Sequence, residues 1–225
     1  MFRQAAATIR EVLYGIIARS NLGASTNHNM GSGVMVAQGL IVTNAHILHL
    51  NGDVANCLHR EFEVIRSPDI GKNPVKATLV GEDTFRDIAL LRIDDTSNRY
   101  ASLEPALVAS GTSCGSLGFP LSVLQSNNGQ TCYCFIERFQ GAYVSAYIQE
   151  YLNDKLLCWY EVDRVMYGGS SGCPFFTPDG KVIGLQTRVR DADGDPHNQN
   201  FLAISLLIPS TEVLKFLKNC QIQLP

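Results

Sequence analysis

The sequence predicts an all-β protein, built as a β-sandwich or as a pair of β-barrels. Short apolar segments rich in Val, Ile and Leu recur along the 225 residues, and turn-forming residues separate them. These segments do not alternate with long helical patterns, which argues against a parallel sheet covered by helices. With 45% hydrophobic and 17% charged residues, the chain can bury a sizeable core and is not disordered as a whole.

Strand signals cover most of the chain. Residues 9–18 are predicted to form a short helix or a covering strand, and Gln38-Gly39 is predicted to join two strands in a tight hairpin. The strands are predicted at 33–36, 40–43, 61–65, 76–80, 88–93, 142–147, 156–162, 181–187 and 201–208.

Three segments differ from this pattern. Residues 210–218 begin with Ser-Thr-Glu, end in lysines and carry apolar residues at helical spacing, so we expect a C-terminal helix. Residues 97–110 suit a linker between two β modules. Residues 191–199 resemble part of a calcium-binding loop, but the twelfth position is Leu202 and the glycine falls at the fourth place instead of the sixth. We therefore expect an exposed hairpin loop there.

Charge and cysteine content exclude several classes of partner. Eighteen basic and 21 acidic residues give a net charge of -3 without a block of like charge, so nucleic acid and anionic membranes are not expected partners. No apolar run approaches the roughly 20 residues of a membrane span.

The seven cysteines include no C-x-x-C pair, which predicts neither a disulfide framework nor a zinc ribbon. Scattered thiols and the lack of a secretory signal favour a cytoplasmic location.

A candidate nucleophile lies in a glycine-rich segment. Ser171 stands within Gly-Gly-Ser-Ser-Gly at 168–172, where flanking glycines allow successive backbone N–H groups to point at one oxyanion. Gly168, Ser170 and Gly172 also fit the nucleophile elbow of α/β-hydrolases. That elbow must open into a helix, and the prolines at 174 and 178 exclude one here.

A serine hydroxyl needs a base, and His46 has the most suitable context of the five histidines. It follows the predicted strand 40–43, where a side chain sits on a rigid element and faces a cleft. The alternatives are a histidine in a short helical turn at 45–49, or His49 as the functional residue.

The other histidines, His28, His59 and His197, lie in polar segments and are expected at the surface. His46, His49, Cys57 and His59 match no common zinc spacing, so no metal is expected.

Asp87 is the candidate third group. It directly precedes the apolar residues 88–93, and a carboxylate at the mouth of a buried strand is placed to orient an imidazole.

Together these segments resemble the trypsin-like serine proteases of the chymotrypsin fold, most closely the HtrA/Deg-type protease domain without a following PDZ module. Residues 31–34 (Gly-Ser-Gly-Val) and 41–46 (Ile-Val-Thr-Asn-Ala-His) resemble its histidine motif, and 87–91 (Asp-Ile-Ala-Leu-Leu) its aspartate motif. Residues 169–174 (Gly-Ser-Ser-Gly-Cys-Pro) resemble its Gly-Asn-Ser-Gly-Gly-Pro. The order His, Asp, Ser also matches, and the resemblance spans about residues 9–218.

The resemblance implies one protease domain over residues 1–225, made of two antiparallel six-stranded β-barrels and a C-terminal helix. Residues 1–105 would form the barrel with His46 and Asp87, and residues 106–225 the barrel with Ser171. The backbone N–H groups of Gly169 and Ser171 would form the oxyanion hole. The function implied is that of a serine endopeptidase acting on proteins or peptides without a cofactor.

Two departures from the family motif suggest an alternative. Ser170 replaces its Asn and Cys173 replaces its second Gly, so the loop backbone could be tilted. The alternative is a protease-like scaffold that binds peptides with little or no turnover. By position Cys173 is a packing residue and not the nucleophile.

Substrate preference is indicated by family position. Val165 would lie at the floor of the pocket for the side chain before the cut, which favours small or medium apolar residues. Gln186, Thr187 and Arg188 would offer an extended peptide a strand edge, and Arg188 with Arg190 could instead select an acidic residue. Residues 1–17 could mediate a homo-oligomer or cover the first barrel.

Overall fold

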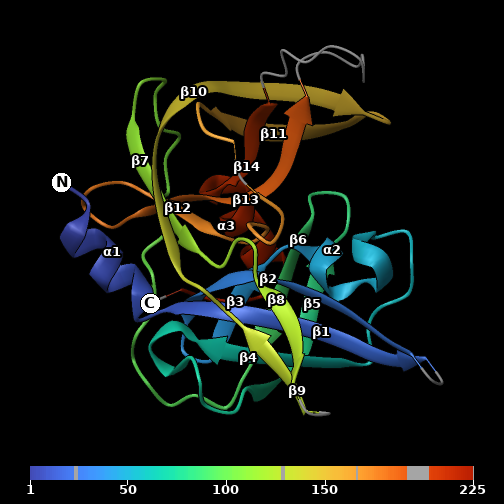
Figure 1. Cartoon of the computed structure of the whole chain (residues 1–225). Helices are drawn as coiled ribbons and strands as arrows, with labels where there is room; N and C mark the ends of the chain where they lie inside the picture. Colours follow the sequence, from blue (N-terminus) through green and yellow to red (C-terminus); the bar gives the residue numbers. More distant parts are fainter. Residues whose placement is uncertain (23–24, 128–129, 166, 192–202, 225) are drawn as a thin grey trace.

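Two closed β-barrels lie against each other (Figure 1). The structure is a computed structural model and describes residues 1–22, 25–127, 130–165, 167–191 and 203–224. Within these residues the strands form two six-stranded antiparallel barrels and one separate two-stranded hairpin. The predicted all-β fold with two six-stranded barrels is confirmed.

The first barrel has the strand order β1-β2-β3-β6-β5-β4 and closes where β1 pairs with β4. Its strands are β1 (Leu13–Leu22), β2 (Ser25–Ala37), β3 (Leu40–Thr43), β4 (Glu61–Arg66), β5 (Val75–Asp83) and β6 (Ile88–Arg92). The predicted β2–β3 hairpin is confirmed, and Gly39 in its turn has a φ of 67°, which favours glycine.

The pairing of β3 with β6 positions the site. Both strands consist almost entirely of buried apolar residues, and Thr43 at the end of β3 faces Ala89 at the start of β6. Since the strands are antiparallel, the segment that follows β3 and the segment that precedes β6 meet at one edge of the barrel.

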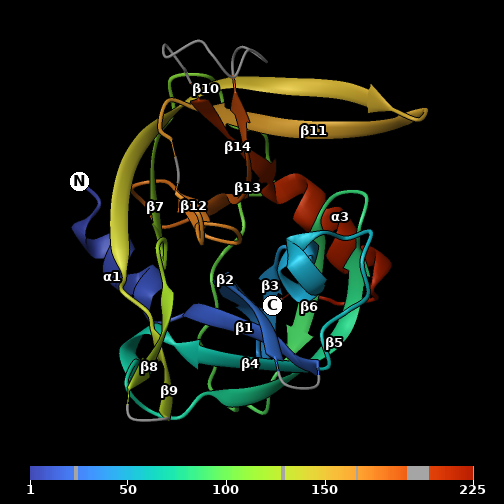
Figure 2. The same cartoon turned by 45° about the vertical axis from the view of Figure 1, so that its right-hand side comes forward.

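The second barrel has the order β10-β11-β14-β13-β12-β7 and closes where β10 pairs with β7. Its strands are β7 (Ser113–Gly118), β10 (Arg138–Leu152), β11 (Lys155–Val162), β12 (Pro174–Phe176), β13 (Val182–Asp191) and β14 (Ala203–Pro209). The hairpin β8 (Val123–Asn127) and β9 (Gln130–Cys134) belongs to neither barrel. Figure 2 shows that the β10–β11 hairpin projects beyond the barrel.

The helices lie outside the barrels. They are α1 (Arg3–Arg10), α2 (Ala45–Leu48) and α3 (Ser210–Asn219), with short 3-10 turns η1 (Leu50–Gly52) and η2 (Ser67–Asp69). The predicted C-terminal helix is confirmed as α3, which buries Val213, Phe216 and Leu217 against the body because they share one face. No helix in the described part of the chain is long and apolar enough to cross a bilayer.

The N-terminal segment differs from the prediction. Residues 9–18 are divided between the end of α1 and strand β1 of the first barrel. Helix α1 packs on the second barrel instead of covering the first, since the ring of Phe2 lies 5.6 Å from that of Phe139 and 6.1 Å from that of Phe176.

Two predicted loops have different outcomes. Between β6 and β7, the segment predicted as a linker contains no described strand, and Leu103 makes a single bridge to Val182. Strand β13 runs to Asp191, and the predicted loop beyond it lies outside the described residues.

Candidate active site

His46 lies at the edge of the first barrel where β3 ends. The four residues of β3 are buried, Asn44 continues in an extended conformation, and α2 begins at Ala45. His46 is therefore the second residue of a one-turn helix that starts directly from a rigid strand. Its side chain keeps 24% of its surface exposed.

Asp87 lies at the same edge, immediately before β6, and is only 2% exposed. One carboxylate oxygen, Oδ1, accepts the backbone N–H of His46 at 2.8 Å, and Oδ2 lies 2.8 Å from Nδ1 of the imidazole. The hydroxyl of Thr187 donates to Oδ2 as well, and the side-chain amide of Asn44 donates to the Asp87 carbonyl at 3.0 Å.

These contacts set the charge of the Asp87 carboxylate. Burial acts to raise its pKa, but the hydrogen bonds and the charge of His46, with the hydroxyl of Thr187, outweigh that effect and lower the pKa below its ordinary value. The carboxylate is thus ionised over the neutral range, although it is almost fully buried.

Ser171 comes from the loop between β11 and β12 of the second barrel. Its Oγ lies 2.9 Å from Nε2 of His46. Two backbone bonds fix the loop: Ser32 N–H donates to the Ser171 carbonyl at 2.8 Å, and Gly172 N–H donates to the Gln186 carbonyl at 2.8 Å. Gly172 has a φ of 78°, a conformation that glycine adopts without strain.

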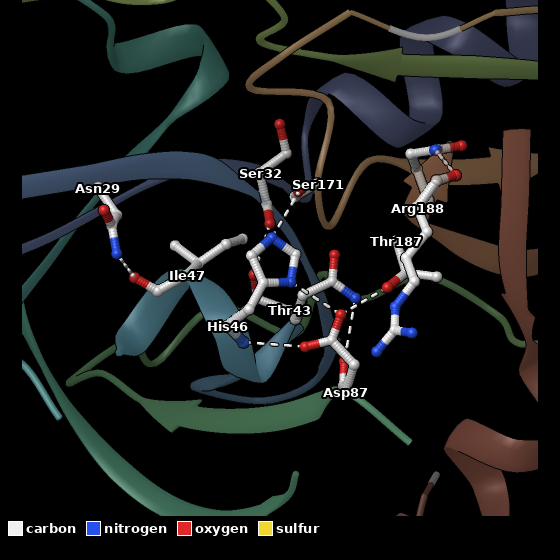
Figure 3. A network of polar contacts seen from close by, with 11 residues as sticks. Asn29, Ser32, Thr43, His46, Ile47, Asp87, Ser171, Thr187 and Arg188 are labelled. Atoms are coloured by element: carbon white, nitrogen blue, oxygen red, sulfur yellow. Dashed lines mark hydrogen bonds and ion pairs between the residues drawn. The ribbon is translucent and has the colours of Figure 1, made fainter. Parts of the chain in front are cut away.

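Figure 3 shows the three side chains side by side in space, with the imidazole of His46 between Asp87 and Ser171. An ionised carboxylate only accepts hydrogen bonds, so Nδ1 of His46 carries the ring hydrogen. Nε2 is then left as the acceptor for the serine hydroxyl. This arrangement can take the proton of Ser171 and stabilise the imidazolium that results.

The loop also presents two backbone donors beside Ser171. Ser170 N–H donates to the Tyr167 carbonyl, and Gly169 adopts a φ of 86°. Within the described residues, the N–H groups of Gly169 and Ser171 donate to no backbone carbonyl.

Comparison with known proteins identifies the family. Residues 31–185 match the family described as the trypsin-like peptidase domain. The chain belongs to this family. The match includes all three side chains described above.

Several known proteins resemble this trypsin-like peptidase domain. A Halomonas elongata protein named probable periplasmic serine endoprotease DegP-like is 26% identical over 183 residues, 80% of this chain and 33% of that protein. A Pseudomonas fluorescens protein of the same name is 25% identical over 183 residues, 80% of this chain and 33% of that protein. The chain spans about a third of the length of these relatives. Their names place them in the periplasm, so the cytoplasmic location predicted for this chain is not confirmed.

A solved structure shares the fold. The Rv3671c protease of M. tuberculosis in its active form superposes with a TM-score of 0.72 at 17% identity, covering 98% of this chain and 86% of that one.

His46 lines two cavities in the trypsin-like peptidase domain. One, of about 350 Å³, is lined by His46, Ser171 and Gly169 and by residues 28–30 of β2 among others. The other, of about 240 Å³, is lined by His46, Asp87, Thr187 and Arg188 and by residues 52–54.

The residues predicted to bind substrate differ in their exposure and in their contacts. Val165 is 43% exposed and lines neither cavity. Gln186 and Thr187 are buried, and the hydroxyl of Thr187 is directed at Asp87. The guanidinium of Arg188 lies 5.8 Å from the centre of the Trp159 ring and borders the smaller cavity.

The two departures from the family motif are both buried. Ser170 is 2% exposed and its hydroxyl has no partner among the described residues. Cys173 is fully buried, with Sγ 3.3 Å from Oγ of Ser32 and packed against Gly118. Burial raises the pKa of the Cys173 thiol to about 11. A neutral thiol enclosed in this way is a packing group.

Two more histidines, His49 and His59, follow α2 in the chain and are buried. His49 is buried, with Nδ1 2.6 Å from the Asn56 carbonyl and Nε2 2.9 Å from the Glu82 carboxylate. The prediction that His59 lies at the surface is wrong: it is 3% exposed, and neither ring nitrogen has a partner among the described residues. His28 is half-buried, and His197 lies outside the described residues.

The prediction for His59 failed because its polar neighbours are exposed, whereas His59 itself is buried and its backbone N–H donates to the Leu48 carbonyl at 2.8 Å. Local polarity therefore did not indicate exposure. Across the described part of the chain, no three His, Cys, Asp or Glu side chains are grouped so that they could ligate a metal.

The sequence indicated neither the bond from Thr187 to Asp87 nor that from Asn44. Thr187 lies 100 residues beyond Asp87, and only the packing of the two barrels brings them together.

Proposed function

We propose that this chain is a serine endopeptidase with Ser171 as nucleophile, His46 as general base and acid, and Asp87 as the group that orients His46. The observation that supports this most directly is the imidazole of His46, 2.9 Å from the hydroxyl of Ser171 and 2.8 Å from the carboxylate of Asp87. The two barrels, residues 1–105 and 106–225, would form one catalytic unit, because each supplies part of this arrangement.

Peptide cleavage would proceed in two stages. Ser171 Oγ attacks the carbonyl carbon while Nε2 of His46 takes its proton, and the N–H groups of Gly169 and Ser171 stabilise the oxyanion. The imidazolium then protonates the departing amine, the C–N bond breaks and an acyl-enzyme remains. His46 next activates a water molecule, whose attack releases the acid and restores Ser171. No cofactor takes part.

The substrate would be an extended protein or peptide segment. Strand β13 pairs with β14 on one edge, whereas its pairing with β12 ends at Leu185, so from Thr187 onward that edge has no strand partner among the described residues. A peptide added there would run past Arg188 toward Ser171. We expect small or medium apolar residues before the cut; this expectation rests on the family position of the uncharged Val165, which lines neither cavity beside His46.

Fluorophosphonate labelling tests the proposal, because only an activated serine reacts. Wild type should be labelled stoichiometrically and should cleave an unfolded protein such as casein, whereas Ser171→Ala should do neither. A Ser210→Ala variant is the matched control and should be labelled like wild type, since Ser210 lies in α3. A folded wild type that is neither labelled nor active would favour a peptide-binding scaffold with altered Ser170 and Cys173.

Self-association stays a prediction. Size-exclusion chromatography with light scattering would determine whether the chain is a monomer or a homo-oligomer in solution.

A further inference from the structure

The turn that carries Asp87 is joined to the C-terminal helix by an ion pair. Nε of Arg86, the residue before Asp87, lies 3.0 Å from Oε2 of Glu212 in α3. The Glu212 side chain is only 5% exposed and that of Arg86 is 34% exposed. The Glu212 carboxylate is thus largely shielded from water, and a buried charge left without its partner is costly.

The same guanidinium also closes the turn internally. Asp83, at the end of β5, accepts the backbone N–H of Arg86 at 2.9 Å, and its Oδ2 pairs with Nη1 of Arg86 at 2.8 Å. Arg86 is therefore held between Asp83 and Glu212, and Lys215 contacts the other oxygen of Glu212 at 2.6 Å. A planar guanidinium can bind two carboxylates at once, which a lysine ammonium does less well.

Asp87 needs such support because its backbone is strained. Its φ is 61°, the left-handed region that costs an L-residue free energy unless its surroundings impose it. The carboxylate must nevertheless meet both N–H groups of His46 at 2.8 Å. A small rotation of the turn would move it away from the imidazole.

The ion pair also connects the two halves of the site. Helix α3 packs on strands β13 and β14 of the second barrel, whereas the turn belongs to the first. A second contact spans the same junction, because Nζ of Lys155 in β11 lies 5.3 Å from the centre of the Phe85 ring. The barrel that carries Ser171 therefore helps to hold the turn that carries Asp87.

We propose that Arg86 is a positioning residue, which holds the Asp87 carboxylate against His46 through its ion pair with Glu212. The proposal rests on the proposed function, because it assigns Arg86 a part in the same hydrolysis. It predicts that loss of the pair lowers kcat and leaves KM almost unchanged, since no residue of the β13 edge is altered.

Steady-state kinetics on Arg86→Gln, Arg86→Lys and Glu212→Gln test this, with rates expressed per site titrated by fluorophosphonate. Arg86→Gln should lower kcat roughly tenfold, because small displacements of catalytic groups have large effects on rate. Glu212→Gln should have a smaller effect, since Asp83 still holds Arg86. Arg86→Lys should recover only part of the loss, because an ammonium binds two carboxylates less well. Arg92→Gln, at the exposed far end of β6, is the matched control and should equal wild type.

The double variant Arg86→Gln with Glu212→Gln shows whether the two residues affect kcat together, through their ion pair, or independently. Its kcat should equal that of Arg86→Gln alone, and a loss equal to the product of the single losses would overturn the proposal. So would an Arg86→Gln enzyme whose kcat per titrated site stays within twofold of the Arg92→Gln control. A wild type that is not labelled overturns the proposed function together with this inference, whereas a labelled wild type with an unaffected Arg86→Gln overturns the inference alone.

Discussion

The backbone N–H of Ser32 donates a 2.8 Å hydrogen bond to the carbonyl of Ser171, so a strand of the first barrel holds the loop of the second. The carbonyl of Ser32 accepts in turn from the hydroxyl of Thr43 at 2.7 Å, at the end of the strand that leads to His46. The position of the Ser171 hydroxyl relative to His46 thus depends on contacts between the barrels as well as on the loop itself.

Gly172→Ala should disrupt this junction. A Cβ at position 172 would lie 1.9 Å from the carbonyl oxygen of Ser32, and the φ of 78° is unfavourable for alanine. We expect the free energy of unfolding to fall by about 3 kcal/mol or more. Urea denaturation measures this, with Gly168→Ala as the control, because a Cβ there meets no atom within 4 Å. Equal midpoints for the two variants would contradict the prediction.

Cys173→Ala should weaken the packing under the loop without abolishing activity. The Cys173 thiol fills the space between Ser32 and Gly118, so its removal leaves a small cavity and should cost about 1 to 2 kcal/mol of stability.

Because burial raises the pKa of the Cys173 thiol to about 11, iodoacetamide at pH 8 should modify the exposed Cys57 but not Cys173 in the folded protein. Modification of Cys173 at the rate of Cys57 would show that it is accessible.

The fold follows from the sequence where local signals are strong. The buried strands β3 and β6 and helix α3 have the apolar periodicity of their class, and each is predicted within about a residue. Strand β7 (Ser113–Gly118) has the sequence Ser-Cys-Gly-Ser-Leu-Gly, which lacks the β-branched residues typical of strands, so only its pairing with β10 and β12 makes it one. Strand β12 was missed because a strand of three residues that begins with a proline gives no period.

The candidate site is predictable to a similar extent. His46, Asp87 and Ser171 each follow a local pattern that the sequence displays. Arg86 and Thr187 do not, because each owes its role to a partner about 100 residues or more away and carries no distinguishing neighbours. The pattern that identifies Asp87 therefore does not indicate what keeps it in place.

Thr187→Val should lower activity by loosening Asp87. Valine keeps the shape of threonine but removes the hydroxyl that donates to Oδ2 of Asp87. His46 still holds the carboxylate, so we expect kcat to fall by only about threefold to tenfold, with the protein remaining folded. Thr78→Val, at an exposed position of β5, is the control. An unchanged kcat in titrated Thr187→Val enzyme would show that the hydroxyl has no part in positioning Asp87.

The pair of His49 and Glu82 should make stability depend on pH. Burial acts to lower the pKa of His49, but the bonds to Asn56 and Glu82 outweigh it and raise the pKa above its ordinary value. The folded state therefore binds the proton more tightly than the unfolded state, and the stabilisation is fully present below about pH 6.5. It should be lost as the pH rises through the raised pKa of the folded state. His49→Gln should thus cost about 1 kcal/mol near pH 6 and less at pH 9, as measured by urea denaturation.

His59 provides the comparison with opposite sign. Burial lowers its pKa, with smaller contributions from His28 and His49, and its ring nitrogens have no partner among the described residues to accept or supply a proton. The unfolded state then binds the proton more tightly, so the contribution of neutral His59 is present above about pH 6.5 and is lost as the pH falls. Relative to wild type, the His59→Gln variant should therefore become more stable as the pH falls. The His49→Gln variant should become less stable relative to wild type over the same change. Parallel pH profiles for the two variants would contradict the assignment of pKa shifts in opposite directions to these two histidines.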